Sequence, residues 1–374
     1  MVMFMKLKLF MFLNYCICAV GTTQLIPYIT YLGFDTKSKS YLLAMIAIFT
    51  IVLQFCSGYI SDKLRKIKIV FLEIYVVYLI SNIILFKSIN YEFMYYLFVV
   101  GLVGGCYRCS QGLLDSWIVQ LDKDNFASIR AYGALGWGVG SILLALIIEK
   151  YGFDVIPLIL IIVGGCSFIL SLSIQDSKRD KAKLAISDLR IISENKKYMI
   201  FVVIVFLLYA LGCADMYIVV DKILAIGGTK WIVGMKWGLQ SLFEIPILLI
   251  GNRLLKKYGV YKLMLFSCLM FLIRFLLYAW IQIPIYFLYA SIFQLVTFPI
   301  VVFCSKEEFD ELIDERLKTT AQMFAMSIYM GVSLFIMPIL CNYLVESFGY
   351  DFSLYIVSLF SILTIVLLCI YKKL

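Results

Sequence analysis

The chain has 374 residues, of which 63% are hydrophobic and 15% are charged, and its net charge is +9. Soluble domains are about 45–50% apolar and about 25% charged, so this composition excludes an ordinary soluble fold and predicts a protein that lies in a lipid bilayer. The positive charge does not indicate a nucleic-acid partner, because the Lys and Arg residues collect in short segments between apolar runs, which is typical of membrane topology.

The apolar runs are long enough for membrane-spanning helices, which need about 20 largely apolar residues. The first run is too long for a cleaved signal peptide and lacks a small-x-small cleavage site. In chain order we predict twelve spans, at residues 8–32, 40–61, 68–87, 92–121, 127–149, 154–174, 198–221, 230–251, 262–281, 284–304, 319–345 and 352–371.

The chain divides into two similar halves. A polar loop, residues 175–197, separates a first half, residues 1–174, from a second half, residues 198–374. The turn GYISDKLRK follows the second span and GNRLLKKYG the eighth, while EKYGFD follows the fifth and ESFGYD the eleventh. Similar turns at matching places predict a duplicated six-helix architecture, and transporters with such repeats bind substrate near the bilayer midplane.

The distribution of Lys and Arg predicts the orientation of these spans. If the N-terminus lies inside, the segments on that side contain most of the Lys and Arg residues, including those of the central loop. Because these residues resist translocation, we predict a multi-pass protein of the plasma membrane with both termini in the cytoplasm.

The fourth span carries two opposite charges on a glycine-lined face, which favours a water-filled cavity over lipid at that face. Arg108 and Asp115 are two turns apart, about 10 Å, which is too far for a direct ion pair. Glu73 is a candidate partner for Arg108. The residues that share this face are Gly101, Gly104, Arg108, Gly112 and Asp115.

The fifth span begins with IRAYGALGWGVGS and places Arg130 near Asp115. The two residues are equally far from the turn between the fourth and fifth spans, so they lie at matching depth and can pair. This pair either contacts the substrate or is a structural ion pair.

The same segment contains a strip of small residues. Gly133, Gly136 and Gly140 share one side of the helix, which predicts close packing against another helix. Trp137 lies off the strip and can face a cavity, although an aromatic core or lipid contact remains an alternative.

The second half has charged residues inside its seventh, eighth and ninth spans, namely Asp215, Glu244 and Arg274. A charge near mid-bilayer costs about 2.5–3.5 kcal/mol on insertion scales, so such residues are functional candidates. Because the chain has no histidine, a proton carrier must be a carboxylate. The candidates are Asp215, Glu244 and Asp115, and the alternative is buried pairing of these carboxylates with Arg274, Lys236 or Arg130.

The motif after the second span resembles the loop motif of the major facilitator superfamily. Its Gly-x-x-x-Asp core is present as Gly58 and Asp62, whereas the usual later glycine is Arg65. Together with the twelve spans and the 6+6 division, this resemblance implies an all-α integral membrane fold of two pseudo-symmetric six-helix halves.

The fourth and fifth spans resemble those of the lactose permease and phenylpropionate permease branch, in LLDSWIVQL followed by IRAYGALGW. By position, the resemblance implies that Asp115, Arg130 and Trp137 contact the substrate. It extends to LFEIP, to Arg274 and to TTAQMFA. In the tenth span, two polar residues replace the histidine and glutamate that serve proton coupling in lactose permease; they are Gln294 and Thr297.

These features predict a secondary active transporter that takes up a sugar or oligosaccharide with protons. The alternative is transport, in either direction, of an aromatic acid, nucleoside or drug, because Arg108, Arg130 and Arg274 suit an organic anion. A membrane sensor that has lost transport is a third hypothesis. A membrane enzyme or a primary pump is disfavoured, since the chain has no histidine, no ligand-like cysteine spacing and no nucleotide-binding loop. We therefore expect a monomer whose partners are a small molecule, protons and the bilayer, with no cofactor and no metal.

Overall fold

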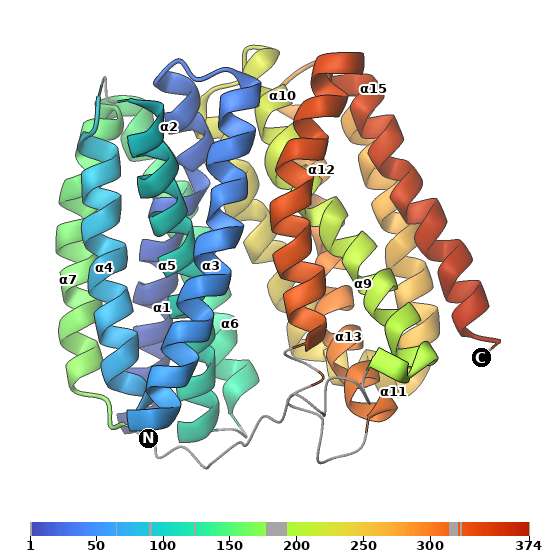
Figure 1. Ribbon diagram of the computed structural model, residues 1–374, viewed down its shortest axis with the longest axis horizontal. Helices are drawn as coiled ribbons and strands as arrows, with labels where there is room; N and C mark the ends of the chain where they lie inside the picture. The colour runs from blue at the N-terminus through green and yellow to red at the C-terminus, as the bar shows by residue number, and fades with distance from the viewer. Residues whose placement is uncertain are drawn as a thin grey trace. The chain divides into compact units, whose positions relative to one another are not determined.

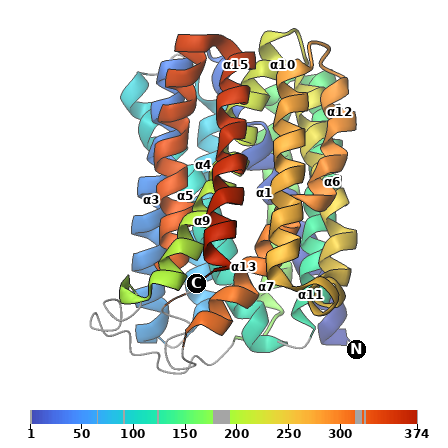
Figure 2. The same ribbon diagram turned by 90° about the vertical axis from the view of Figure 1, so that its right-hand side faces the viewer.

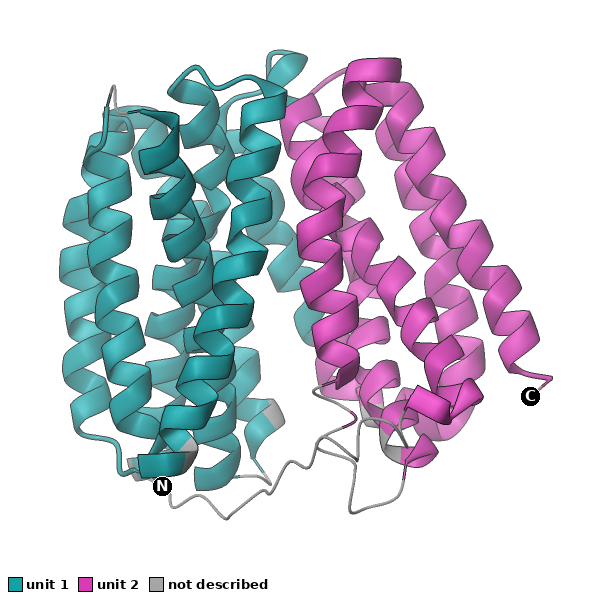
Figure 3. Ribbon diagram, viewed as in Figure 1, with its two compact units in different colours: residues 1–181, 223–245 teal, residues 182–222, 246–374 magenta. Residues whose placement is uncertain are grey.

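The computed structural model describes residues 2–64, 66–89, 92–122, 125–176, 193–313, 321 and 324–373, and these residues are helical apart from short connections. Their contacts divide the chain into two compact units (Figure 3). Unit 1 consists of Met1–Lys181 and Ile223–Ile245, and unit 2 of Ala182–Lys222 and Pro246–Leu374. The two domains expected from the sequence, separated at residues 175–197, stay a prediction, and residues 223–245 are part of unit 1.

The helices of unit 1 run side by side along their length (Figures 1 and 2). They are α1 (Val2–Thr23), α2 (Leu25–Tyr31), α3 (Thr36–Leu64), α4 (Ile67–Lys87), α5 (Phe93–Leu121), α6 (Phe126–Tyr151), α7 (Ile156–Leu172) and the first part of α11 (Lys230–Trp280). Helix α1 contacts α6 and α7, and α5 contacts α3 and α4.

Local chemistry explains where two of these helices begin. The first span is interrupted at Gln24, three residues before Pro27, because Pro27 has no N–H to donate to the preceding turn. Helix α3 begins after Asp35, whose carboxylate accepts a hydrogen bond from the backbone N–H of Ser38 at 2.9 Å. Hydrogen bonds from Ser38 lower the pKa of Asp35, so the charged form of this cap is favoured.

The predicted glycine strip of the fifth span packs against α1, which confirms that expectation. A Cβ added at Gly136 would overlap the carbonyl oxygen of Phe12, and one at Gly140 would lie 2.8 Å from the Cα of Cys16. The Cys16 thiol donates a hydrogen bond to the carbonyl oxygen of Gly136 at 3.0 Å. Only glycine therefore allows α1 and α6 to approach this closely.

Unit 2 contains several helices with irregular turns. Its regular helices are α9 (Lys196–Ala214), the first part of α10 (Val220–Ala225), the second part of α11, α12 (Tyr286–Ala290), α13 (Phe298–Leu312) and α15 (Ser333–Tyr371). Wide π-helical turns occupy Asp215–Val219 and Ser327–Val332, and a tight 3₁₀ segment occupies Ser291–Val296. Pro246 lies inside α11 without ending it.

The described helices agree with the twelve predicted spans, although the first residues of the eleventh, 319–345, lie outside the described residues. Eleven described helices are long and apolar enough to cross a membrane, and the last of them covers Phe324–Tyr371. This last helix is two spans, because Gly349 has a φ of 74° and the chain reverses there, as the two limbs of α15 show in Figure 1. A positive φ is a conformation that glycine adopts without strain. The protein is therefore an all-helical, multi-pass membrane protein.

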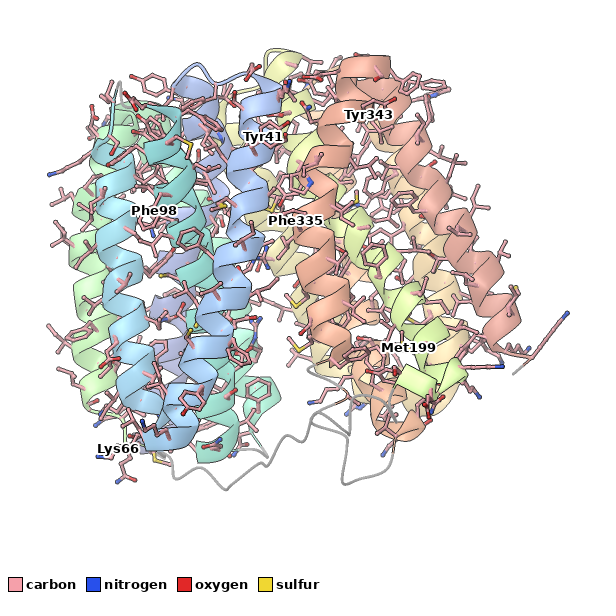
Figure 4. All side chains as sticks on the ribbon, in the orientation of Figure 1. Tyr41, Lys66, Phe98, Met199, Phe335 and Tyr343 are labelled. Atoms are coloured by element: carbon pink, nitrogen blue, oxygen red, sulfur yellow. The ribbon has the colours of Figure 1, made fainter. Side chains whose placement is uncertain are left out.

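The outward-facing side chains match a lipid environment. In Figure 4, Phe98 projects from α5, and Phe335 projects from α15. These residues are 56% and 44% exposed, respectively. Lys66, by contrast, lies near the ends of α3 and α4, outside the apolar belt. Many other large hydrophobic residues are exposed as well, and so much exposed apolar surface is stable in lipid and not in water.

Candidate functional site

A group of polar and aromatic side chains lies within unit 1, on three helices that contact one another. We call it the unit 1 cluster; its members are Asn14, Tyr15, Tyr107, Arg108, Gln111, Asp115, Arg130 and Trp137. Helices α1, α5 and α6 carry these residues, and the glycine contacts between α1 and α6 hold two of the three helices together.

The predicted pairing of Asp115 with Arg130 is present. Arg130 Nε lies 3.7 Å from Asp115 Oδ1, and the two side chains keep 36% and 37% of their surface exposed. The guanidinium carbon of Arg130 lies 4.3 Å from the centre of the Tyr15 ring, which is a cation–π contact. Gly133 makes room for this stack, since a Cβ there would lie 3.0 Å from the Tyr15 ring. The pair is thus preorganised and still accessible to a ligand.

Trp137 lies next to Tyr107 on the neighbouring helix. The two ring centres are 5.9 Å apart and the rings are inclined by 42°. Both residues are half-buried, so each keeps part of its ring open. The aromatic pair can stack on a flat ligand ring.

The expectation that the glycine stripe of the fourth span lines a cavity is wrong for two of its members. Cβ atoms at Gly101 and Gly104 would collide with side chains of α3, at 2.7 Å from Phe49 and 2.5 Å from Ile46. These glycines serve helix packing, whereas a Cβ at Gly112 would meet only an atom 4.0 Å away.

The partner suggested for Arg108 is not its partner. Glu73 is exposed, and no ion pair joins it to Arg108 among the described residues. The guanidinium of Arg108 instead lies 6.0 Å from the Tyr107 ring. Its Nε is buried and has no hydrogen-bond partner in the described part of the chain. Arg108 therefore retains hydrogen-bonding capacity within the unit 1 cluster.

Two charged residues of α11 also belong to unit 1. Glu244 is half-buried, and its carboxylate interacts electrostatically with Arg130. Lys236 is fully buried, with its ammonium nitrogen 4.0 Å from the centre of the Trp237 ring. The structure thus places Glu244, a predicted proton carrier, near the cluster that holds the predicted substrate residues.

A second polar group surrounds Arg274 in unit 2. We call it the unit 2 cluster; its members are Asp215, Arg274, Tyr278, Gln294 and Thr297. Arg274 Nη2 lies 2.9 Å from Asp215 Oδ2, Nε donates to the Tyr278 hydroxyl at 2.9 Å, and Nη1 donates to Thr297 Oγ1 at 3.0 Å and to Gln294 Oε1. Arg274 is 1% exposed. Asp215 and Arg274 thus form a buried ion pair, which was the alternative to a proton-carrying role for Asp215.

Two of the irregular turns of unit 2 occur at this cluster. Asp215 begins one π-helical turn, and such turns are frequent at functional sites. Thr297, with φ −110° and ψ −98°, separates the 3₁₀ segment from α13. Pro299 follows in the first turn of α13 and cannot donate a backbone hydrogen bond. Broken helices expose backbone groups at membrane depth where polar side chains are gathered.

One buried charge was not anticipated from the sequence, because the seventh span was expected to end at residue 221. Lys222 is 0% exposed and its ammonium donates to the carbonyl oxygens of Tyr278 and Ala279, at 2.7 and 2.9 Å. It also forms an ion pair with Asp351 at 2.8 Å. These contacts tie the end of α11 to the second limb of α15.

The loop motif lies only partly within the described residues. Gly58 is part of α3, and a Cβ there would meet nothing within 4 Å. The side chain of Asp62 and all of Arg65 lie outside the described residues, as do most residues of the segment TTAQMFA.

A surface hollow lined by Leu146, Glu149, Lys150, Thr229 and Trp231 contains no member of either cluster. Within the described ranges, no group of three His, Cys, Asp or Glu side chains is arranged to hold a metal ion.

Comparison with known proteins identifies a family and a fold. A sequence model of the MFS_1 like family matches residues 4–366. Two crystal structures of the nucleoside transporter NupG, one of them of a point mutant, superpose with TM-scores of 0.84 and 0.85. They share 17% and 16% identity with this chain and cover 100% and 99% of both chains, respectively. No protein with a curated description matches the chain.

Proposed function

We propose that this chain, which belongs to the MFS_1 like family, moves nucleosides across the membrane by alternating access. The family identifies it as a membrane transporter and not an enzyme. The sequence alone favoured a sugar and kept a nucleoside as an alternative. The nucleoside alternative is now the better supported, because the similar solved structures that span the whole chain are of a nucleoside transporter.

The observation that carries the proposal is the composition of the unit 1 cluster. A nucleoside has a flat base and a ribose with several hydroxyls. The Trp137–Tyr107 pair offers an aromatic surface for the base. The Arg130–Asp115 pair offers donors and acceptors for hydroxyls, and both side chains remain about one-third exposed. We therefore assign Asp115, Arg130, Trp137 and Arg108 to substrate binding.

Coupling to protons is the second part of the proposal, and Glu244 is its best candidate carrier. Protonating Asp215 would break its ion pair with Arg274 and leave a buried, unpaired guanidinium, which costs about 3–5 kcal/mol. Glu244 is half-buried and interacts with Arg130. A substrate that binds Arg130 would change the charge environment of Glu244, which links the two ligands.

Transport assays with purified protein in liposomes test the proposal. We expect saturable uptake of labelled uridine and adenosine, stimulated when the interior is made alkaline. Labelled lactose and phenylpropionate serve as competing substrate classes. Uptake of lactose without uptake of either nucleoside would contradict the nucleoside assignment and restore the sugar hypothesis.

A further inference from the structure

Two amide side chains of the unit 1 cluster contact each other and are not among the residues assigned to substrate binding. Asn14 lies on α1 and is fully buried, and Gln111 lies on α5 and is half-buried. Gln111 Nε2 donates to Asn14 Oδ1 at 2.9 Å and lies 2.9 Å from the sulfur of Cys18. The pair therefore joins α1 to α5 beside the ion pair and the aromatic pair.

Each amide keeps one polar atom that meets no partner among the described residues. These atoms are Asn14 Nδ2, a donor, and Gln111 Oε1, an acceptor, and both are shielded from solvent. A shielded polar atom without a hydrogen bond is unfavourable, so such atoms mark places where a ligand or water binds. The oxygen and nitrogen of an amide are assigned from their contacts. Exchanging them in both residues still leaves one donor and one acceptor.

The position of Gln111 connects the amide pair to the rest of the cluster. Tyr107, Gln111 and Asp115 are spaced four residues apart on α5, so they lie on one face in successive turns. Tyr107 contacts Trp137, and Asp115 contacts Arg130. Asn14 precedes Tyr15, which stacks on Arg130. The free donor and acceptor thus lie between the aromatic surface and the ion pair.

We propose that Asn14 and Gln111 recognise the hydrogen-bonding edge of the nucleobase, where a ring or exocyclic N–H lies beside a carbonyl oxygen or ring nitrogen. This inference rests on the proposed nucleoside substrate. Because the amides present either order of donor and acceptor, they accept uracil and adenine edges alike. They reject a base whose edge N–H carries a methyl group, since the methyl removes the donor and leaves an amide oxygen unpaired.

Competition binding to the purified full-length protein tests this inference. The probes are labelled uridine, displaced by uridine or by 3-methyluridine, which lacks the N3–H donor. We expect wild type to bind 3-methyluridine at least about tenfold more weakly than uridine, as the loss of one shielded hydrogen bond implies. In Gln111→Leu and Gln111→Met, the affinity ratio between the two ligands should fall towards one.

Gln54→Leu is the matched control, because Gln54 is an exposed glutamine on α3, and its ratio should equal that of wild type. An unchanged ratio in both Gln111 variants, with uridine still bound, would overturn the role of the amide pair and leave the proposed function intact. Failure of wild type to bind uridine or adenosine would instead contradict the proposed function, and the inference with it.

Discussion

The ion pair between Asp215 and Arg274 gives a quantitative prediction about the unit 2 cluster. The relevant variants are Asp215→Asn, Arg274→Gln and the double variant that combines them. The Arg274 and Asp215 side chains are 1% and 8% exposed, so each single change leaves one charge nearly shielded from solvent. The double change removes both charges together.

The expected costs follow from the contacts. Removing one partner of a buried ion pair costs about 3–5 kcal/mol. In Asp215→Asn the new amide still accepts a hydrogen bond from Nη2, which recovers about 1 kcal/mol, so we expect a loss of about 2–4 kcal/mol. Arg274→Gln should lose about 3–5 kcal/mol, because Asp215 keeps its charge. The double variant should lose less than Arg274→Gln alone.

The assay is reversible unfolding of the purified full-length protein in mixed micelles, which gives the free energy of unfolding. Asp154→Asn is the control, because this carboxylate is exposed and its neutralisation should change the unfolding free energy little. If the two single losses add in the double variant to within about 0.5 kcal/mol, the two residues are not coupled and the unit 2 cluster is not held by this pair.

Three further predictions concern packing, binding and coupling. Gly136→Ala should destabilise the protein by about 1–3 kcal/mol, because the added methyl group overlaps the backbone of Phe12. The control is Gly165→Ala, whose methyl group enters open space and should be neutral or slightly stabilising. Equal thermal stability of the two variants would contradict the predicted packing. Arg130→Lys should reduce uridine counterflow at least about tenfold at unchanged expression, since lysine lacks the planar fork, and near-normal counterflow would reduce Arg130 to a structural role. Glu244→Gln should retain counterflow and lose accumulation driven by a pH gradient, and continued accumulation would exclude Glu244 as the proton carrier.

The fold was predictable because each span can be recognised in the sequence from its length and apolar composition. Lipid leaves the chain few alternatives to helices, so the run lengths alone located the twelve spans. The irregular turns at Asp215, Thr297 and Ser327 were not predictable, since a change of helix type depends on packing and on distant partners. The polar contacts of Arg274 with residues of two other helices are an example of such partners.

The candidate site was predictable only where two residues lie near one turn. Asp115 and Arg130 could be paired because both are equally far from the connection between adjacent spans. Asn14 and Gln111 were missed, because their contact joins the first and fourth spans and no sequence spacing measures that distance. The signal available was their polarity within apolar runs. The prediction that Gly101 and Gly104 line a cavity was wrong, because a stripe of small residues has the same sequence pattern whether it faces water or another helix.

The central claim is that the unit 1 cluster binds a nucleoside, and an experimental structure of the protein with uridine bound measures this most directly. We predict density for the base against the Trp137 and Tyr107 rings, and for the ribose within hydrogen-bonding distance of Arg130 or Asp115. Uridine bound at a place that contacts none of these four residues would contradict the account.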